Sequence, residues 1–301
     1  MTVAGLDIGG TKIEVRIFDP DWTEIGRNRC ATPKTYEDLV AAIAGQIEWA
    51  ENYAGPLAAI GVGTAGLVNP KTGHAFTANL PATGHAFPAD IENAINRRIS
   101  FVNDCRALAL SEAVFGAGRG HRTVMGLIIG TGIGGGIAID GTLIPGPTAT
   151  GGEFGHFAAP AHIVAQHNLP IVQCGCGRMG CIETFVAGPG LERLAVHLTG
   201  QMLTAPVISQ QRRGDMAEVW ALWCALAAEM LHTLTLTVDP DVIVLGGGLS
   251  SISGVIEDLG AAAQRVQIPG FESAPLVLAQ GGDASGARGA AYAAWSELQN
   301  G

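Results

Sequence analysis

Residues 3–18 read VAGLDIGGTKIEVRIF, which is an apolar strand, a glycine turn and a second strand in direct succession. Residues 13–18 alternate Ile and Val with Glu and Arg, the pattern of a strand with one buried face. In the turn Gly9-Gly10-Thr11, the two glycines allow a tight reversal of the backbone. This stretch therefore predicts a β-hairpin that opens an α/β domain.

The same pattern returns at residues 124–140, VMGLIIGTGIGGGIAID, as a strand, the glycine turn GTGIGGG and the strand IAID. A turn at Asp140-Gly141 follows. The two stretches agree in pattern rather than letter by letter, which suggests two domains built on one template. A chain of 301 residues is long enough to hold two cores.

Strands and helices alternate over the rest of the chain, which is typical of the α/β class with mixed sheets. We expect a small first domain over residues 1–120, completed by a C-terminal helix at 288–301, and a larger second domain over residues 121–287. The other expected elements are strands near 25–31, 58–63, 99–102, 242–245 and 276–279, and helices near 36–54, 88–98, 104–115, 215–238, 251–266 and 288–298.

Composition narrows the class of protein. Hydrophobic residues make up 48% of the chain and charged residues 15%, which is typical of a compact globular protein. The formal net charge of −10 comes without a basic cluster, so we expect no nucleic-acid partner. Asp7 interrupts the first apolar run, which argues against a signal peptide, and the apolar stretch with Glu229 and His232 reads as too polar to span a membrane. We expect a cytoplasmic protein with reduced thiols and no membrane partner.

Three of the six cysteines lie within eight residues, in the stretch CGCGRMGCIE at 174–183. This is metal-ligand spacing, and a closed Zn²⁺ site needs four nitrogen or sulfur ligands. We expect the imidazole of His156, in GGEFGH at 151–156, to be the fourth ligand. The alternative is a set of ordinary buried or disulfide-linked cysteines, although a Cys-Gly-Cys pair is too short to bridge to itself comfortably. Zinc would pin this loop and the carboxylates that flank it, Glu153 and Glu183.

The motifs GEFGH and CGCGxxGCxE resemble the signature of the ROK family of sugar kinases and sugar-responsive repressors. The resemblance covers Asp7 to Ala291 and implies the two-domain actin-like ATPase/hexokinase (ribonuclease H-like) fold, with a cleft between the domains. It also implies structural Zn²⁺ on His156, Cys174, Cys176 and Cys181, and sugar contacts from Glu153, His156 and Glu183.

Two segments fit GxGxxG, at 61–66 and 130–135, but neither is followed by the helix that a dinucleotide site needs. A glycine turn between strands instead exposes backbone N–H groups to phosphate oxygens. Residues 7–12 and 130–136 resemble the two phosphate loops of the actin-like ATPase and hexokinase superfamily. The resemblance implies ATP contacts from Asp7, Gly9, Gly10, Thr11, Lys12, Gly130, Thr131, Gly132 and Gly134, with Asp7 helping to hold Mg²⁺. The alternative for each loop is a plain tight hairpin.

A third glycine run, Gly246-Gly247-Gly248, stands between a predicted strand and a predicted helix. It suits the close approach of an adenosine, and residues 286–290 are a candidate border of the same pocket. Both stretches also fit crowded packing sites.

Asn103 and Asp104 end a predicted strand and begin a predicted helix. Phosphoryl transfer to a sugar hydroxyl needs a carboxylate that accepts the proton, and Asp104 is placed for it. The alternative is that Asp104 only caps the helix. In the family, an Asn-Asp pair here carries sugar binding and catalysis. The chain departs from the family pattern at Arg106, where a small amide is usual, and at Ala65, where a proline is often found.

Together these features predict an ATP-dependent kinase that phosphorylates O6 of a hexose. The segment TANLPA at 77–82 most resembles bacterial N-acetylglucosamine kinases, which implies a sugar contact from Asn79. Fructokinases are also similar, notably at CIETF, and glucokinase or N-acetylmannosamine kinase activity stays open. The rivals are a non-catalytic sugar sensor, whose DNA-binding segment would precede Asp7, and an actin-like ATPase. Family members are often dimers or tetramers, and we expect a homodimer.

Overall fold

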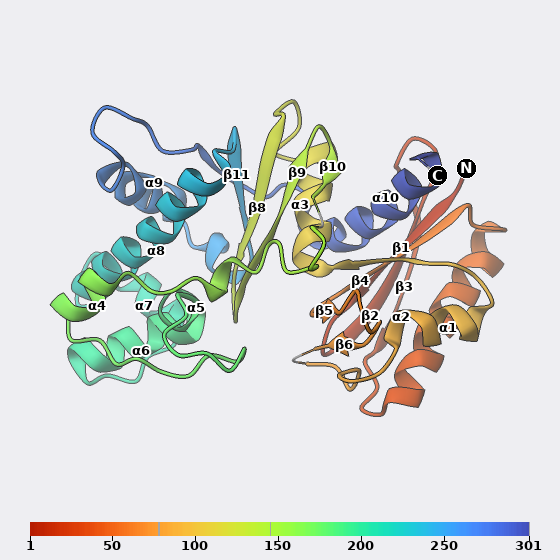
Figure 1. Ribbon diagram of the computed structural model, residues 1–301, viewed down its shortest axis with the longest axis horizontal. Helices are drawn as coiled ribbons and strands as arrows, with labels where there is room; N and C mark the ends of the chain where they lie inside the picture. Colours follow the sequence, from red (N-terminus) through yellow and green to blue (C-terminus); the bar gives the residue numbers. More distant parts are fainter. Residues whose placement is uncertain (78, 145, 301) are drawn as a thin grey trace. The chain divides into compact units, whose positions relative to one another are not determined.

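The computed structural model of the chain describes residues 1–77, 79–144 and 146–300 (Figure 1). Ala78, inside the predicted sugar segment, and Gly301, at the end of the predicted last helix, lie outside the described residues. The chain divides into two compact units, the first made of Met1–Gly120, Gly136–Gly152 and Gln280–Gly301, and the second of His121–Gly135 and Glu153–Ala279. The sequence-based boundaries placed residues 136–152 and 280–287 in the second domain.

The first unit contains a five-stranded mixed sheet in the order β3-β2-β1-β4-β7. Its strands are β1 (Val3–Ile8), β2 (Lys12–Phe18), β3 (Glu24–Ala31), β4 (Ala59–Thr64) and β7 (Ser100–Asn103). β1 and β2 form the predicted hairpin, whereas β1, β4 and β7 are parallel. Ile8, Thr64 and Asn103 are in register, so the carboxyl ends of three parallel strands meet at one edge. A short hairpin of β5 (Leu67–Val68) and β6 (Ala75–Phe76) follows β4.

Helices cover this sheet on both faces. On one face, α1 (Tyr36–Ala54) and α2 (Phe87–Ile95) bury an aliphatic core against β1 and β2. The other face carries α3 (Asp104–Phe115) and α10 (Ser285–Asn300), which follows the short 3₁₀ turn η3 (Gly282–Ala284). The predicted bounds of α1 and α3 are confirmed, and each helix begins where a side chain caps it, Thr35 for α1 and Asn103 for α3.

Three glycines allow α10 to approach the sheet and α3 at backbone distance. A Cβ at Gly5 would lie 1.8 Å from the carbonyl oxygen of Ala287, and a Cβ at Gly61 would lie 1.8 Å from that of Ala290. A Cβ at Gly289 would likewise lie 1.8 Å from the carbonyl oxygen of Ala107. The packing of α10 therefore depends on glycine at these positions.

Gly61→Ala is expected to lower the free energy of unfolding of the first unit by about 3 kcal/mol or more, because a methyl group at backbone contact distance forces β4 and α10 apart. Urea denaturation followed by tryptophan fluorescence and circular dichroism measures the loss. Gly45→Ala is the matched control: Gly45 is exposed inside α1, and a Cβ there would meet nothing within 4 Å, so alanine should stabilise by about 0.5–1 kcal/mol. Equal stability of the two variants would contradict the packing described here.

The second sheet has the order β10-β9-β8-β11-β12. Its strands are β8 (Thr123–Ile129), β9 (Ile133–Ile139), β10 (Thr142–Leu143), β11 (Val242–Gly246) and β12 (Leu276–Leu278), and the boundary between the two units falls within β9. The glycine turn is shorter than predicted, because Gly134, Gly135 and Gly136 lie in β9. A Cβ at Gly135 would lie 2.1 Å from the carbonyl oxygen of Gly126, so this strand glycine serves packing. Asp140 and Gly141 form the predicted turn, with φ of 51° and 71°.

The helices of the second unit between residues 161 and 210 were not predicted. They are α4 (Ala161–Gln166), α5 (Glu183–Val186), α6 (Gly188–Thr199) and α7 (Ala205–Gln210); η1 (Phe154–His156), α8 (Ala217–Val238), η2 (Gly248–Ser251) and α9 (Val255–Arg265) complete the unit. With a mean hydropathy of 1.4 over its best window, α8 is long and apolar enough to cross a membrane, contrary to the prediction from Glu229 and His232. Half of that window is buried, and α8 packs against α5, α6 and α9, as the core helix of a globular unit does.

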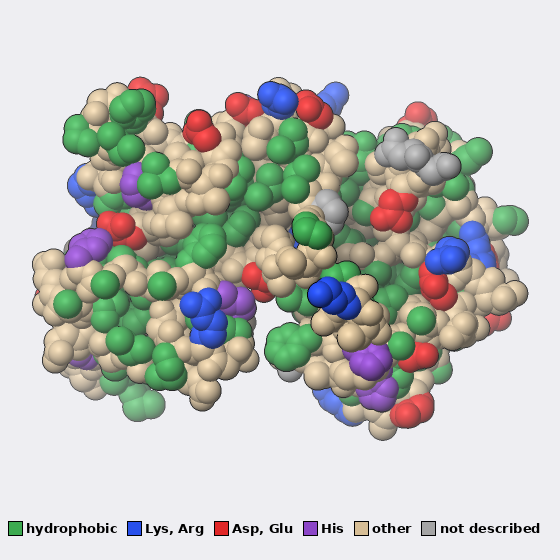
Figure 2. Space-filling view, viewed as in Figure 1, with side chains coloured by type: hydrophobic (Ala, Val, Ile, Leu, Met, Phe, Trp, Pro, Cys, Tyr) green, Lys and Arg blue, Asp and Glu red, His purple; other side chains and the backbone are tan. Residues whose placement is uncertain are grey.

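Charged side chains are dispersed on the face drawn in Figure 2. The Lys and Arg side chains lie scattered there, several of them beside carboxylates. In the sequence as a whole, 27 acidic residues outnumber 17 basic ones.

Candidate active site and metal centre

The first predicted phosphate loop is a closed turn between β1 and β2. The amide of Gly9 donates to the carbonyl oxygen of Lys12 at 2.9 Å. Thr32, just after β3, holds the loop from the side: its hydroxyl donates to the carbonyl oxygen of Gly9 at 2.6 Å and its amide to that of Thr11 at 3.1 Å. The sequence did not indicate Thr32, because this contact spans more than twenty residues. The loop is therefore held in shape within the first unit itself.

Asn79 lies against this loop. A Cβ at Gly10 would lie 2.9 Å from the Cβ atom of Asn79, so only glycine lets the two segments approach so closely. The segment that carries Asn79 is closed by two threonines. The amide of Thr77 donates to the hydroxyl of Thr83 at 2.9 Å, and that hydroxyl donates to the carbonyl oxygen of Thr77 at 2.8 Å.

Asn103 and Asp104 stand where β7 ends and α3 begins. Asn103 caps the helix, because its Oδ1 accepts from the amides of Cys105 and Arg106 at 3.0 and 3.3 Å. Its Nδ2 donates to the carbonyl oxygen of Gly66 at 3.0 Å, a partner that the sequence did not indicate. The carboxylate of Asp104 accepts from the amide of Cys105 at 2.8 Å. The N-cap of α3 is thus Asn103, and the structure does not support the alternative in which Asp104 serves only as the cap.

The pKa values of the carboxylates of Asp7 and Asp104 are both raised. Burial and the nearby charge of Asp104 raise the pKa of Asp7 to about 6, although the charge of Lys12 opposes the rise. Burial also raises the pKa of Asp104, against the hydrogen bond from the Cys105 amide. A carboxylate with a raised pKa is a stronger proton acceptor than an exposed one, and such groups concentrate at functional sites.

The two glycine runs of the second unit lie beside each other. A Cβ at Gly130 would lie 3.7 Å from the amide nitrogen of Gly248, and Gly247, with φ of 88°, packs against the carbonyl of Ile129. The amide of Gly130 donates to the carbonyl oxygen of Gly132 at 2.9 Å and closes the turn, which contains Thr131. Gly246 ends β11, whereas Gly134 lies inside β9. Residues 286–290 lie in α10 of the first unit, where Gly289 packs against Ala107.

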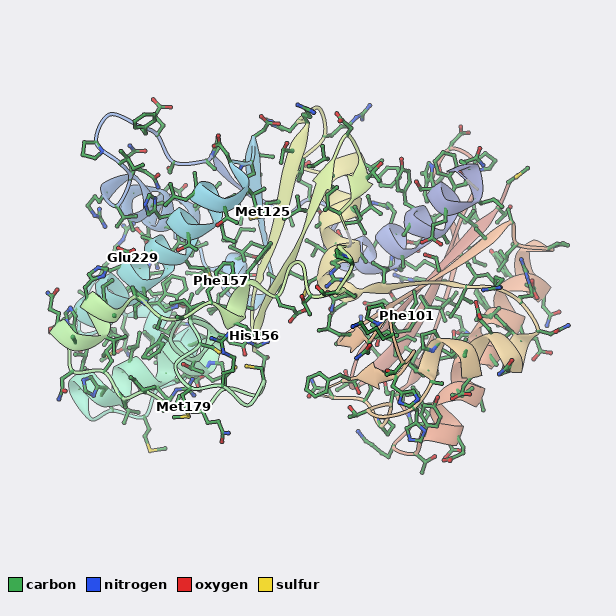
Figure 3. The ribbon with its side chains drawn as sticks, in the orientation of Figure 1. Phe101, Met125, His156, Phe157, Met179 and Glu229 are labelled. Carbon is green, nitrogen blue, oxygen red and sulfur yellow. The ribbon has the colours of Figure 1, made fainter. Side chains whose placement is uncertain are left out.

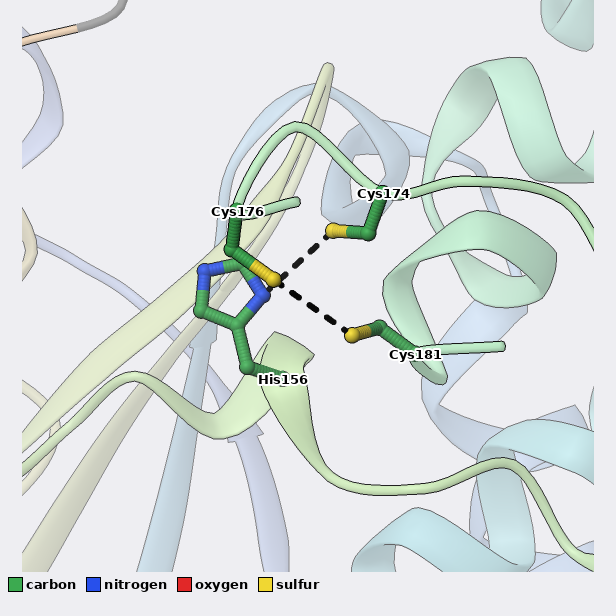
Figure 4. Close-up of side chains that lie close together, drawn as sticks. All are labelled: His156, Cys174, Cys176 and Cys181. Atoms are coloured by element: carbon green, nitrogen blue, oxygen red, sulfur yellow. Dashed lines mark hydrogen bonds between the residues drawn. The ribbon is translucent and has the colours of Figure 1, made fainter. Parts of the chain in front are cut away.

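Four predicted metal ligands converge in the second unit (Figure 4). One ligand atom from each of His156, Cys174, Cys176 and Cys181 lies within 4.8 Å of the others. The Sγ atoms of Cys176 and Cys181 are 3.7 Å apart, and the Sγ of Cys174 is 3.5 Å from Nδ1 of His156. A tetrahedral Zn²⁺ with bonds of about 2.3 Å to sulfur and about 2.0 Å to nitrogen would place its ligands about 3.5–3.8 Å apart. The donor set and its spacing fit zinc.

The cysteine loop is folded by its glycines and its own backbone. Gly177 and Gly180 have φ of 88° and 70°, which favour glycine, and the amide of Cys174 donates to the carbonyl oxygen of Arg178 at 2.8 Å. Met179, at the outer tip of the loop, is 60% exposed (Figure 3). The loop therefore directs its three sulfurs inward and its tip outward.

Carboxylates surround this centre. Nε2 of His156, the nitrogen that faces away from the sulfurs, lies 3.6 Å from Oε2 of Glu153. Oε2 of Glu183 accepts from the amide of Ile133 at 2.7 Å, and its Oε1 accepts from the thiol of Cys174 at 3.4 Å. Glu183 thus joins the cysteine loop to the start of β9, directly after the second glycine turn. Burial and the neighbouring thiols raise the pKa of Cys174 to about 12, so without a metal this thiol keeps its proton. A bound Zn²⁺ would replace that proton.

Comparison with known proteins extends over nearly the whole chain. The family model described as "ROK family" matches residues 3–297. The chain is 40% identical to an N-acetylgalactosamine kinase, AgaK, of Shewanella sp. (strain ANA-3), over 95% of this chain and 94% of that protein. It is 36% identical to an N-acetyl-D-glucosamine kinase of Pectobacterium atrosepticum, over 95% of this chain and 97% of that protein.

One solved structure of similar fold contains a sugar and a nucleotide analogue. The crystal structure of a ROK family glucokinase from Streptomyces griseus, in complex with glucose and AMPPNP, matches with a TM-score of 0.79 and 28% identity. The match covers 98% of this chain and all of that one. The predicted fold is confirmed, and the chain belongs to the ROK family as an ATP-dependent sugar kinase.

Proposed function

We propose that this kinase transfers the γ-phosphate of ATP to the 6-hydroxyl of an N-acetylhexosamine, with N-acetyl-D-glucosamine as the preferred sugar. Two relatives, at 40% and 36% identity, are named for N-acetylgalactosamine and N-acetyl-D-glucosamine. The segment around Asn79, which lies against the first glycine loop, is one of the stretches that resemble bacterial N-acetylglucosamine kinases. The observation that carries the proposal is the placement of Asp104 near Asp7 at the carboxyl edge of parallel strands.

In this reaction Asp104 accepts the proton of the 6-hydroxyl while that oxygen forms its bond to the γ-phosphorus. The bond from phosphorus to the bridging oxygen of ATP breaks, and ADP leaves with that oxygen. Its raised pKa makes Asp104 a better proton acceptor, and its position as the first residue of α3 fixes the carboxylate on a rigid helix.

Nucleotide contacts are assigned to backbone groups of the glycine turns. In the proposal, Gly9, Gly10, Thr11 and Lys12 serve from the first unit, and Gly130, Thr131, Gly132, Gly134, Gly246, Gly247 and Gly248 serve from the second. Asp7 is the residue that would hold Mg²⁺. The ion would neutralise charge on the phosphates, and the raised pKa of Asp7 fits a carboxylate that gains from a cation partner.

Sugar contacts are assigned to Asn79, Asn103, Asp104, Glu153, His156 and Glu183. Five of these side chains already have hydrogen-bond or ion-pair partners that fix their orientation: Asn103, Asp104, Glu153, His156 and Glu183. Once a bound sugar buries them, polar groups of this kind discriminate against analogues that lack a matching hydroxyl. Bound zinc would fix the orientation of the His156 ring through Nδ1, while Nε2 faces Glu153.

The test is ADP release from ATP and Mg²⁺ with N-acetylglucosamine, N-acetylgalactosamine, N-acetylmannosamine, glucose, fructose or no sugar. We expect the highest kcat/KM for N-acetylglucosamine and negligible turnover without sugar. A preference for fructose or glucose would place the chain in another subfamily, and sugar binding without turnover would identify a sensor. A homodimer in the cytoplasm completes the proposal, and sedimentation velocity measures the assembly directly.

Asp7→Asn is expected to stabilise the protein without Mg²⁺ and nucleotide at pH 8, while abolishing its Mg²⁺-dependent activity. Raising the pKa of Asp7 from 3.8 to about 6 makes its ionised form cost up to about 3 kcal/mol of folding free energy at pH 8. That cost falls as the pH drops through 6 and vanishes below about 4, where Asp7 is protonated in both states. Urea midpoints at pH 8 and 4.5 measure the gain, which should shrink at the lower pH. An equal gain at both would contradict the raised pKa.

A further inference from the structure

Arg106, two residues after Asp104, is buried deeply for an arginine. Only 8% of its surface is exposed, and its Nη2 donates to the carbonyl oxygen of Ala149 at 2.6 Å. Its amide donates to Oδ1 of Asn103. A Cβ at Gly136 would lie 2.9 Å from the Cα atom of Arg106, so β9 also packs against this turn of α3. Arg106 is thus the point where the helix that bears Asp104 meets β9 and the chain around Ala149.

The loop of residues 146–152, which Arg106 contacts at Ala149, has little regular secondary structure. In the loop of residues 146–152, Gly146, Ala149 and Gly152 have φ of 65°, 54° and 96°. Alanine in the left-handed region costs about 1 kcal/mol, so a neighbour must hold it there. Within the loop, the amide of Ala149 reaches the carbonyl oxygen of Gly146 only at 3.4 Å, and the hydroxyls of Thr148 and Thr150 pair at an exposed position. The charged hydrogen bond from Arg106 is the strongest of these restraints.

The loop leads directly to Glu153, which follows Gly152 in the chain. We propose that Arg106 is a positioning residue for sugar binding: it fixes the 146–152 loop and, through it, the orientation in which Glu153 is presented. The backbone amide at position 106 donates to Oδ1 of Asn103, and the Arg106 side chain donates to Ala149, so this position links the backbone that carries Asn103 and Asp104 with the loop before Glu153. This inference rests on the proposed sugar contacts of Glu153 and Asn103.

A cavity beside Arg106 makes a sharp test possible. It has a volume of about 300 Å³ and is lined by Phe101, Arg106, Leu110, Thr142, Leu143 and Glu297, among others. Truncating Arg106 would extend this space toward Ala149. A small guanidinium compound can then enter the enlarged cavity and replace the lost hydrogen-bond donor. A void large enough only for a water molecule would not admit it.

The experiment compares Arg106→Ala and Arg106→Lys with Arg27→Ala, an exposed arginine on β3, as the matched control. For Arg106→Ala we expect the KM for the sugar to rise roughly 10-fold while the KM for ATP changes by less than about twofold. Lysine, which keeps the charge and one donor, should show a smaller rise. Methylguanidinium chloride at about 10–50 mM should lower the sugar KM of Arg106→Ala, whereas NaCl of equal ionic strength should not.

An unchanged sugar KM in both Arg106 variants, or equal rises for sugar and ATP, would overturn the inference. If Arg106→Ala does not fold, Arg106→Lys and the ratio of its two KM changes decide the question. Asp104→Asn in the same assay separates the two proposals. If the wild-type chain shows no sugar-dependent turnover, the proposed function fails, and if Asp104→Asn keeps wild-type turnover, the proposed role of Asp104 fails. If Asp104→Asn loses turnover while the Arg106 variants bind sugar normally, only the role of Arg106 fails.

Discussion

Asp104→Asn is expected to lower kcat by about 10²- to 10⁴-fold while the KM values for sugar and ATP stay within about threefold. The amide keeps the size of the carboxylate and an oxygen that can accept from the Cys105 amide. It cannot accept the proton of the 6-hydroxyl at neutral pH. Because the cap of α3 comes from Asn103, the helix keeps its first turn in the variant.

Coupled-enzyme detection of ADP measures the loss, and isothermal titration with the sugar shows that binding survives. Asp215→Asn, at an exposed position in the second unit, is the control for the change of charge. If Asp104→Asn retained more than about a tenth of the turnover, another group would have to accept the proton.

Loss of zinc is the second large effect. Cys176→Ala is expected to reduce the metal content from one zinc per chain to nearly none, and to raise the sugar KM by at least about tenfold. Structural zinc contributes on the order of 10 kcal/mol of apparent binding free energy, and the cysteine loop has only a few backbone hydrogen bonds to replace it. Without the metal, the ring of His156 would lose its partner at Nδ1 and the cysteine loop would become free to move, whereas Glu183 keeps its bond from the Ile133 amide.

Inductively coupled plasma mass spectrometry of the purified protein gives the zinc content. The rate of limited proteolysis at Arg178 reports the mobility of the cysteine loop. Cys30→Ala, at a half-buried cysteine outside the cluster, should keep both its zinc and its activity. A wild-type chain without zinc, or a Cys176→Ala variant with normal metal content, would refute the assignment.

Local patterns were enough to predict much of the first unit. The β1–β2 hairpin was predicted because the alternation and the glycine turn lie next to each other. The bounds of α1 and α3 are also set locally, since Thr35 and Asn103 cap these helices in the structure. The three cysteines and the Asn-Asp pair were indicated because each motif is contiguous or nearly so, whereas His156, 18 residues before Cys174, came from the expected ligand set and the family resemblance. The structure does place the four metal ligands together.

Features that depend on distant contacts were missed. The start of β9 was predicted too late, because Gly134 to Gly136 resemble a turn in sequence, whereas in the structure they lie in the strand and Gly135 packs against Gly126 and Phe154. The helices between residues 161 and 210 were missed because three of them have at most six residues, too few to show a clear period. Thr32, the contact from Arg106 to Ala149, and the bond from Ile133 to Glu183 each join positions more than twenty residues apart.

The contact between α10 and the first strands has a consequence for biosynthesis. β1 and β4 leave the ribosome well before α10, the helix that covers Gly5 and Gly61. Until α10 emerges, part of one face of this sheet stays open to water and to chaperones. The first unit therefore completes its folding only after α10 has left the ribosome. A stop codon that removes α10 should leave a nascent chain that a chaperone retains.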